Sequence, residues 1–341
     1  MTTPTQPPAL SKKDYASDQH IRWCPGCGDH VILSVIQGAL ARMGIKTENT
    51  VFVSGIGCSS RLPYYMNTYG FHTIHGRAIA VASGIKLANP DLSVWVITGD
   101  GDAMAIGGNH LIHALRRNID INIVMFNNEI YGLTKGQTSP TSPVGLITHS
   151  SPDGAIEPPF IPGQLVIGCG GTFFARVPDT DLKLMESVVI EAANHKGASF
   201  VEVLQNCVIY NDNVHALITS KETRDDNQLK VENGKPLVFG KTRNKGIRLN
   251  GLKLEKVDLS ANGTTENSIL HHDATEPDPA LHLMLARMHL PLFPVAVGVL
   301  RSVSSPTIER TLWEQIDHLH KTKSVNTIGK LLHSGHTWEV E

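Results

Sequence analysis

Four of the five cysteines are spaced so that they could bind one metal centre. Cys24 and Cys27 form a CPGCG knuckle, Cys58 lies in the run GIGCSS, and Cys207 lies in LQNC. Four thiolates suit either a [4Fe–4S] cluster or a zinc ion. Structural zinc sites more often use two CxxC pairs and this chain has one, so the spacing favours iron–sulfur while leaving zinc open. Cys169, in a GCGG turn, is expected to be a small buried or turn residue instead.

A second group of polar residues could bind a divalent cation together with a phosphate group. The sequence GDG at 99–101 and the pair Asn127-Asn128 each follow an apolar run. Asp100 can supply a carboxylate oxygen, Asn128 an amide oxygen and Ile130 a backbone carbonyl, and Mg²⁺ prefers such oxygen ligands. Diphosphate oxygens and water would complete the octahedral shell, and the glycines let the backbone approach the phosphates. Either motif alone could be an ordinary turn, but the two together predict a magnesium–diphosphate site.

The elements that must position these residues alternate between helix and strand over the first 210 residues. Strands are expected at 50–53, 94–98, 121–126, 172–177 and 200–204, and helices at 30–43, 77–88, 109–117 and 181–193. This alternation predicts an α/β fold with a doubly wound, mostly parallel sheet. Such sheets bind ligands at the carboxyl ends of their strands, where the GDG and NN sequences fall. The Gly-, Pro-, Ser- and Thr-rich stretch 132–164 is expected to be a functional loop.

We expect three segments of different character. Residues 1–19 are expected to form a flexible arm, residues 20–215 the α/β domain, and residues 216–341 an irregular extension packed on that domain or on a partner. Within the extension, 228–239 is typical of a hairpin with its turn at Asn233-Gly234. Residues 241–278 are polar and irregular, and Asp278-Pro279 is expected to start a helix that runs through Met288.

Composition excludes several classes of protein. With 341 residues, of which 41% are hydrophobic and 18% charged, the chain can bury a sizeable core. A net charge of −2 argues against a nucleic-acid partner bound through bulk positive charge. The best candidate for a membrane span, residues 281–300, contains charged residues and prolines, and residues 1–15 lack the apolar core of a signal peptide. We therefore expect a cytoplasmic protein with no membrane partner.

Taken together, these motifs resemble one enzyme family. The spacing of GDG and NN is similar to that in the diphosphate-binding half of thiamine diphosphate enzymes. CPGCG, GIGCSSR, HTIHGRA and the late cysteine, added to these, resemble the beta subunit of the 2-oxoacid:ferredoxin oxidoreductases over at least residues 20–215. The run GKPLVFGKTRNKGIRL also looks like the 2-oxoglutarate-type members.

The resemblance implies a reaction and a set of partners. The family oxidatively decarboxylates a 2-oxoacid with coenzyme A on thiamine diphosphate, which for 2-oxoglutarate yields succinyl-CoA and CO₂. Electrons pass one at a time through a [4Fe–4S] cluster to ferredoxin, and the reaction can run backwards to fix CO₂. The glutamate that activates the cofactor comes from the alpha subunit, so we expect this chain to hold half of an active site in an α₂β₂ assembly.

The resemblance also implies roles for individual residues. The cluster ligands are matched by Cys24, Cys27, Cys58 and Cys207. The Mg²⁺ ligands are matched by Asp100, Asn128 and the carbonyl of Ile130. The segments that line thiamine diphosphate are matched by Ile56, Gly57, Cys58, Ser59, Gly84, Gly101, Asp102, Gly132 and Leu133.

Two further residues could contact the substrate. His75, in HTIHGRA, is expected to contact the diphosphate or a substrate carboxylate, although it could simply flank the start of a helix. Arg61 could pair with a substrate carboxylate through its guanidinium, although it could also be a surface arginine. With 2-oxoglutarate as the leading substrate, three alternatives stay open: a pyruvate-specific or broad 2-oxoacid relative, a non-redox thiamine enzyme with structural zinc, and a non-enzymatic iron–sulfur scaffold.

Overall fold

A computed structural model describes residues 10–260, 268–322 and 327–340, and an eight-stranded sheet forms its centre. The strand order is β2-β1-β3-β4-β6-β5-β11-β7. The strands are β1 (Thr50–Ser54), β2 (Tyr69–His72), β3 (Ser93–Gly99), β4 (Asn122–Asn127), β5 (Phe173–Pro178), β6 (Ser199–Leu204), β7 (Gln228–Lys230) and β11 (Val295–Ser302). Strands β1 to β6 are parallel, while β11 runs antiparallel to β5 and pairs in parallel with β7. The prediction of a doubly wound, mostly parallel sheet is confirmed.

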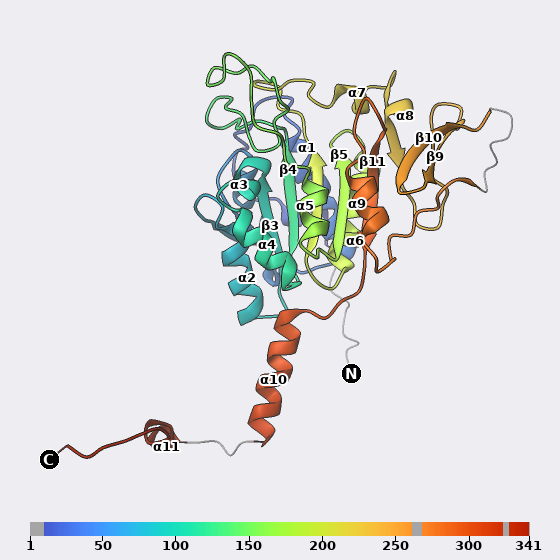
Figure 1. Ribbon diagram of the computed structural model, residues 1–341. Coiled ribbons are helices and arrows are strands. Elements are labelled where there is room, and N and C mark those ends of the chain that lie inside the picture. The colour runs from blue at the N-terminus through green and yellow to red at the C-terminus, as the bar shows by residue number, and fades with distance from the viewer. Residues whose placement is uncertain (1–9, 261–267, 323–326, 341) are drawn as a thin grey trace, which may run out of the picture.

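Helices cover both faces of this sheet (Figure 1). One face packs against α1 (Asp29–Met43) and α6 (Leu182–Asn194). The other packs against α2 (Ala78–Ala88), α4 (Gly108–Arg116), α5 (Pro162–Gly168) and α9 (Ala280–Ala286). Because side chains alternate along a strand, Val51 and Val53 of β1 enter the second of these cores while Phe52 enters the first. Strands buried on both faces therefore appear in the sequence as continuous apolar runs.

The expected helices and strands of the first 210 residues are all present, and their ends are shifted by at most a few residues. Helix α1 ends at Gly44, whose φ of 65° is the left-handed conformation that glycine adopts easily. The remaining short helices of this region are η1 (Lys12–Tyr15), η2 (Thr47–Asn49), η3 (Ser59–Tyr65) and α3 (Asp100–Met104).

The sequence predicted a flexible arm at residues 1–19. The structure describes this segment from residue 10 onward, and there the prediction is wrong. Tyr15 is fully buried against α1, and its hydroxyl donates to the carbonyl of Leu40 at 3.2 Å. Residues 10–19 therefore belong to the folded body, because one buried aromatic side chain holds them there. Residues 1–9 lie outside the described part of the chain.

The hairpin expected at 228–239 is also wrong. Strand β7 joins the main sheet, whereas β8 (Val238–Phe239) joins a separate three-stranded antiparallel sheet with β9 (Lys245–Asn250) and β10 (Lys253–Asp258). Gly234 does form a turn, with φ of 74°, but the chain on its two sides goes to different sheets. The β9–β10 hairpin lies in the stretch expected to be irregular, because its two strands are only partly buried and rich in charged residues, so they lack a strong apolar pattern.

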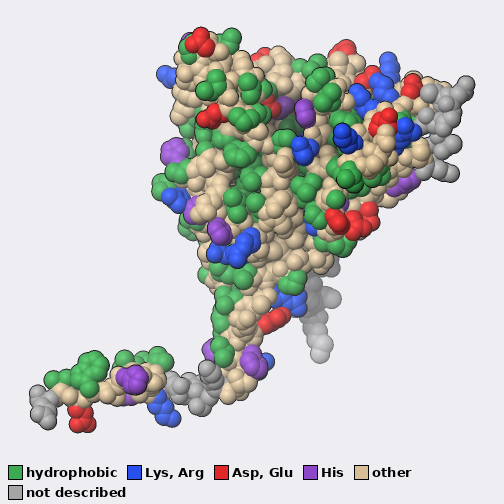
Figure 2. All heavy atoms as spheres, viewed as in Figure 1, with side chains coloured by type: hydrophobic (Ala, Val, Ile, Leu, Met, Phe, Trp, Pro, Cys, Tyr) green, Lys and Arg blue, Asp and Glu red, His purple; other side chains and the backbone are tan. Residues whose placement is uncertain are grey.

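The last helices extend away from the sheet. Beyond the short α7 (Ala216–Thr219), α8 (Arg224–Asn227) and α9, the chain returns through β11 and then forms α10 (Ile308–Thr322) and α11 (Ile328–Leu332). Both project from the body in Figure 1, and Figure 2 shows hydrophobic side chains along them. The indole of Trp313 donates to the carbonyl of Leu87 at 3.3 Å, which ties α10 to the end of α2. Within the described residues, no helix combines the length and apolar character that a membrane crossing requires.

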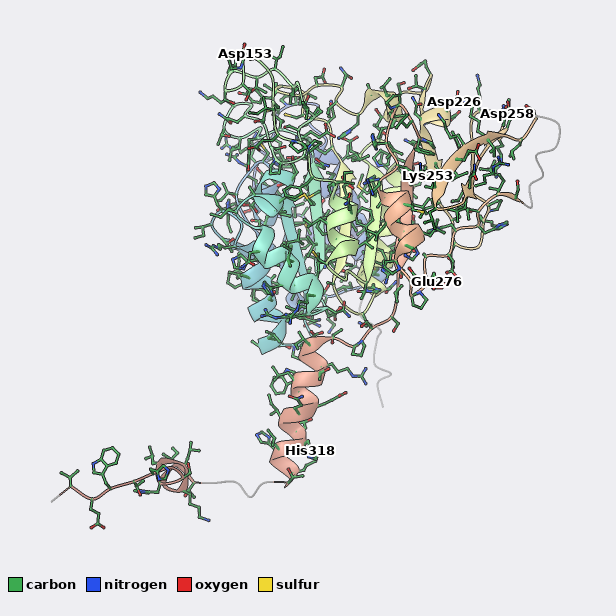
Figure 3. The ribbon with its side chains drawn as sticks, in the orientation of Figure 1. Asp153, Asp226, Lys253, Asp258, Glu276 and His318 are labelled. Carbon is green, nitrogen blue, oxygen red and sulfur yellow. The ribbon has the colours of Figure 1, made fainter. Side chains whose placement is uncertain are left out.

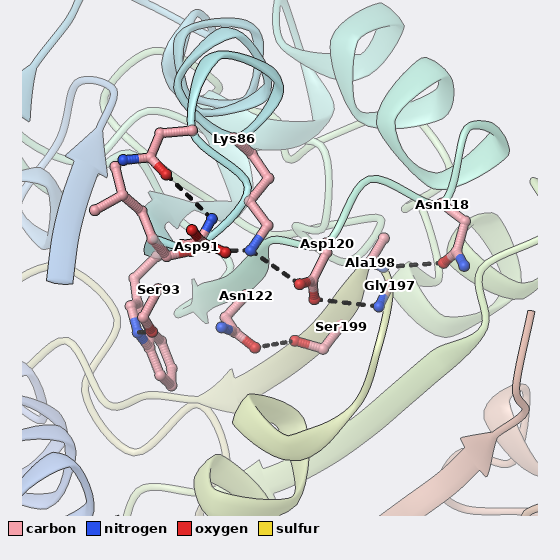
Figure 4. Close-up of polar contacts among 12 residues, drawn as sticks. Lys86, Asp91, Ser93, Asn118, Asp120, Asn122, Gly197, Ala198 and Ser199 are labelled. Carbon is pink, nitrogen blue, oxygen red and sulfur yellow. Dashed lines mark hydrogen bonds and ion pairs between the residues drawn. The ribbon is translucent and has the colours of Figure 1, made fainter. Parts of the chain in front are cut away.

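At the amino ends of the strands, polar side chains bind one another, and we call this group the amino-end network (Figure 4). Lys86 Nζ lies 2.9 Å from Asp120 Oδ2, and the other oxygen of Asp120 accepts from the backbone N–H of Gly197 at 3.2 Å. Asn118 accepts from the backbone N–H of Ala198 at 3.0 Å, and Asn122 accepts from the Ser199 hydroxyl at 2.7 Å. The network connects the turns that precede β4 and β6.

Candidate functional site

A pocket opens at the opposite edge, where β1, β3 and β4 end, and we call it the carboxyl-end pocket. Its cavity volume is about 100 Å³, and the space reaches about 660 Å³ when the open mouth is included. The predicted site residues that line it are Ile56, Gly57, Cys58, Ser59, His75, Asp100, Gly101, Asp102, Asn128, Ile130, Gly132 and Leu133. Gly84 is not among them: it lies on α2, exposed, and a Cβ added there would meet open space. The structure therefore does not bring Gly84 to the pocket.

Asp100 is the buried carboxylate of the pocket, only 2% exposed. It follows β3 directly, and its Oδ2 accepts hydrogen bonds from Ser139 Oγ at 2.5 Å and Thr141 Oγ1 at 2.6 Å. Burial raises the pKa of Asp100 to about 6, although the two hydroxyls lower it in part. An ionised carboxylate this deep is costly unless a cation neutralises it. Asp100 therefore has the properties expected of a ligand to a cation.

Ser139 and Thr141 were not predicted as site residues. Both come from the long loop between β4 and α5, whose outer part is marked by Asp153 above the sheet in Figure 3. Thr141 Oγ1 also lies 2.9 Å from Asn127 Oδ1, so the loop joins the ends of β3 and β4. The abundance of Ser and Thr in the loop was the only sequence signal for this role.

The turn after β4 separates the roles of the two asparagines. Asn127 is buried and donates to Glu202 at 2.8 Å, so it belongs to the frame. Asn128 faces the pocket, with its Oδ1 accepting from the backbone N–H of Ile130 at 3.2 Å. Between them Glu129 has φ of 56°, a conformation that is unusual for a residue with a side chain and is often found at functional sites. Burial, then Asp100 and Glu202, raises the Glu129 pKa to about 8.

Asp102 holds the walls of the pocket in place. Its Oδ1 accepts from the backbone N–H groups of Ile56 at 3.1 Å and Gly76 at 2.7 Å, and its Oδ2 accepts from Thr98 Oγ1 at 2.8 Å. One carboxylate thereby fixes the turns that follow β1 and β2. Tyr131, another residue that the sequence did not reveal, donates to the carbonyl of Gly101 at 3.1 Å from the opposite wall.

The four predicted cysteine ligands lie together beside the pocket, and we call them the four-cysteine group. A Cβ added to Gly132 would lie 3.5 Å from Cys207 Sγ and 3.7 Å from Cys58 Sγ, so both sulfurs flank this glycine. Burial, Asp29 and the nearby thiols of Cys207 and Cys24 raise the pKa of Cys58 to about 12. Burial also raises the pKa of Cys27, with smaller contributions from Asp29, Cys207 and Cys58. The protein surroundings therefore favour the protonated forms of Cys27 and Cys58.

The arrangement of these sulfurs bears on what they could bind. Among the described residues, no three His, Cys, Asp or Glu side chains are arranged to hold a single metal ion. The four cysteines differ in exposure: Cys24 is exposed, Cys27 and Cys58 are partly buried, and Cys207 is buried. Cys169 lies elsewhere, at the end of α5, and packs against the hydrophobic core.

Arg61 is not in the carboxyl-end pocket. It lies in η3 and lines a separate recess. Its backbone N–H donates to the carbonyl of Cys58 at 3.2 Å, and that same carbonyl accepts from the Trp23 indole at 2.7 Å. The other residues of the recess are Gln19, His20, Arg22, Tyr64, Tyr65 and His72. Arg61 therefore lies near the four-cysteine group and apart from His75.

Comparison with known proteins gives consistent results. Residues 55–203 match the family described as the thiamine pyrophosphate enzyme C-terminal TPP binding domain. The chain is 47% identical to 2-oxoglutarate oxidoreductase subunit KorB of Mycobacterium tuberculosis, over 99% of this chain and 91% of that protein. It is 48% identical to 2-oxoglutarate synthase subunit KorB of Archaeoglobus fulgidus, over 54% of this chain and 69% of that protein.

One solved structure is similar over nearly the whole fold. A chain of the 2-oxoglutarate:ferredoxin oxidoreductase from Magnetococcus marinus, with 2-oxoglutarate, coenzyme A and succinyl-CoA bound, superposes with a TM-score of 0.77 at 30% identity. The similarity covers 96% of this chain and 97% of that one. It therefore extends well beyond the residues that carry the sequence motifs.

Proposed function

Because this chain belongs to the beta subunits of the 2-oxoacid:ferredoxin oxidoreductases, we propose specific roles for its carboxyl-end pocket and its four-cysteine group. The chain is the beta subunit of a thiamine diphosphate-dependent 2-oxoglutarate oxidoreductase, an enzyme that also requires an alpha subunit. The reaction is the oxidative decarboxylation of 2-oxoglutarate with coenzyme A to succinyl-CoA and CO₂, with ferredoxin as electron acceptor. In reverse it fixes CO₂, as in a reductive TCA cycle.

The pocket binds Mg²⁺ and the diphosphate of the cofactor. Asp100 supplies the charged ligand, and Asn128 Oδ1 and the Ile130 carbonyl supply the neutral ones. The buried Asp100 carboxylate, braced by Ser139 and Thr141, supports this assignment, because a cation would offset its cost of burial. Thiamine diphosphate, when bound, supplies a nucleophilic carbon that attacks the 2-oxo group.

The remaining pocket residues orient that cofactor and limit access of water to it. Asp102 fixes the backbone at Ile56 and Gly76, which lies next to His75, so these wall segments are held in place before a ligand enters. His75 then faces the cofactor diphosphate or the shared carboxylate of a 2-oxoacid from the pocket wall. The aminopyrimidine activator comes from the alpha subunit, so an α₂β₂ assembly completes the site.

The four-cysteine group holds a [4Fe–4S] cluster through Cys24, Cys27, Cys58 and Cys207. One observation carries the proposal: Cys58 lines the pocket and also belongs to the four-cysteine group. In this proposal the electron exit therefore lies beside the pocket that binds the cofactor. The non-redox alternative with structural zinc is less well supported, because structural zinc sites more often use two CxxC pairs and this chain has one.

Arg61 is the candidate for recognising the distal carboxylate of 2-oxoglutarate, which pyruvate lacks. The recess it lines also contains Arg22, His20 and His72, so an anion could be bound there. Arg61→Met should lower kcat/KM for 2-oxoglutarate about tenfold more than that for pyruvate, because an unpaired carboxylate is costly to bury. Equal losses would instead assign Arg61 to the shared carboxylate or to the surroundings of the cluster.

The experiment that tests the proposal is anaerobic purification of this chain alone and with its alpha subunit. The paired complex should contain about four irons and about four sulfides per beta chain, as a [4Fe–4S] cluster requires. It should turn over 2-oxoglutarate and coenzyme A with reduced ferredoxin as product, while the isolated chain should not. One zinc per chain without iron, or full activity of the isolated chain, would overturn the corresponding part of the proposal.

A further inference from the structure

Gln205 is a buried amide that contacts both halves of the proposed centre. It directly follows β6, is 1% exposed, and its backbone N–H donates to the carbonyl of Asn127 at 2.9 Å. Its side-chain Oε1 accepts from Asn128 Nδ2 at 2.8 Å, while its Nε2 lies 3.3 Å from Cys27 Sγ and donates to it. A single side chain therefore connects a proposed Mg²⁺ ligand to a proposed cluster ligand.

We propose that Gln205 is a positioning residue that orients the Asn128 amide toward Mg²⁺ and tunes the cluster through its N–H···S hydrogen bond to Cys27. This inference rests on the proposed function, because it needs both the metal and the cluster to be bound.

The first half of the proposal follows from the two ends of the Asn128 amide. An amide can ligate a metal only through its oxygen, so the nitrogen must face elsewhere. Gln205 Oε1 accepts a hydrogen bond from that nitrogen at 2.8 Å, which leaves Asn128 Oδ1 on the pocket side. Loss of such supporting partners typically reduces metal affinity 10- to 100-fold.

The second half follows from the direction of the hydrogen bond at sulfur. A donor to a thiolate stabilises negative charge, and cluster potentials depend on hydrogen bonds to the sulfurs. The Nε2 group is further oriented by donation to the carbonyl of Asn206 at 2.6 Å, so its protons point in fixed directions. An N–H donor at Cys27 favours the reduced, more negative cluster and thus raises its reduction potential.

The CPGCG motif makes room for this contact. A Cβ on Gly28 would lie 2.8 Å from Gln205 Cγ and 2.3 Å from Asp179 Oδ2, so only glycine lets the side chain reach Cys27. Asp179 in turn accepts from the backbone N–H of Asn206 at 2.9 Å. The last glycine of the motif and the residue two positions before Cys207 therefore form one packed unit.

Two variants separate the two roles in the anaerobically purified complex with the alpha subunit. Gln205→Glu keeps an acceptor for Asn128 but removes the donor to Cys27, so it should lower the reduction potential in an EPR-monitored titration. Its Mg²⁺ affinity, read from thiamine diphosphate binding, should stay within about threefold of the wild type. Gln205→Leu should lower the potential and also weaken Mg²⁺ about tenfold or more.

A matched control is Gln37→Leu, which removes another buried glutamine whose amide donates to the Tyr65 carbonyl at 3.2 Å. It should change neither the potential nor the Mg²⁺ affinity. Wild-type protein without a cluster would refute the proposed function itself. If the cluster is intact and its potential is the same in wild type and Gln205→Glu, the inference is refuted while the proposed function stands. This comparison does not require Gln205→Leu to fold.

Discussion

At the amino ends of the strands, Lys86 and Asp120 form an ion pair at 2.9 Å, and each also bonds to the backbone of a neighbouring turn. At the carboxyl ends, the Asp100 carboxylate is more deeply buried than Asp120 but has two hydroxyls as partners, and no ion pair found among the described residues includes it. At the amino edge, the two opposite charges neutralise each other within the protein. The second keeps a buried carboxylate with no cationic side chain beside it, which is the arrangement we expect of a cation-binding site and not of a structural brace.

The sharpest contrast should come from the cysteines. Cys207→Ser removes a thiolate from the four-cysteine group at the carboxyl edge, so stoichiometric iron and the visible absorption of the cluster should be lost. Cys169→Ser lies on the core side of α5 and should retain the iron of the wild type. Iron and sulfide analysis of both anaerobic proteins is the measurement. A Cys207→Ser protein with full iron would remove this residue from the ligand set.

The next largest effect is expected at Asp100. Asp100→Ala should weaken Mg²⁺-dependent binding of thiamine diphosphate by at least about 100-fold, equivalent to about 2.7 kcal/mol, because it removes the charged ligand. Apo stability should not fall, since the variant also removes a costly buried carboxylate. Titration calorimetry combined with urea unfolding would measure both. Binding as tight as in the wild type would show that the metal lies elsewhere.

In the amino-end network, a substitution should lower stability and leave cofactor binding unchanged, which is the reverse of the result expected for Asp100→Ala. Asp120→Ala leaves the Lys86 charge buried and unpaired, which should lower the free energy of unfolding by about 2 kcal/mol. The value is below that for a fully buried pair because the Asp120 side chain is 21% exposed. Cofactor affinity of the folded fraction should not change. If affinity fell as far as in Asp100→Ala, the two edges would not be separable.

The smallest effect concerns the pH dependence of stability. His195, whose Nε2 lies 2.8 Å from Thr172 Oγ1 near the amino edge, has a pKa lowered from 6.5, chiefly by burial. The unfolded chain therefore binds a proton that the folded chain resists. The resulting stability is present above about pH 6.5 and is lost as the pH falls through the folded pKa. Unfolding of wild type and His195→Gln at pH 7.5 and 5.5 tests this: the variant should lose less stability in acid.

The elements with strong local signals were predictable from the sequence. Buried parallel strands appear as apolar runs, and a glycine in the left-handed conformation marks the end of α1. Strand β2 was missed because it is an exposed edge strand, held mainly by backbone hydrogen bonds to β1 that leave no apolar pattern. Strand β7 was taken for half of a hairpin because its true partner, β11, lies more than sixty residues away.

The site divides in the same way. Asp100, Asn128 and the cysteines have chemical types that indicate a metal site wherever they gather. Ser139, Thr141 and Gln205 are ordinary polar residues whose importance depends on contacts across the fold. Gly84 is the opposite case, because it was predicted from motif position alone and lies exposed on α2, outside the carboxyl-end pocket. Whether such residues meet in space depends on how distant segments pack, and no single segment of the sequence encodes that packing.

The pairing of β11 with β5 has a consequence for how the protein is made. These strands are antiparallel neighbours in the main sheet, although more than a hundred residues separate them in the chain. During synthesis, the Phe173–Pro178 edge must wait, with its backbone groups unpaired, until residues near 302 have left the ribosome. Non-local pairing of this kind slows folding, and an open strand edge invites association between chains. A nascent or truncated chain that stops before Val295 should therefore depend on chaperones far more than the full chain.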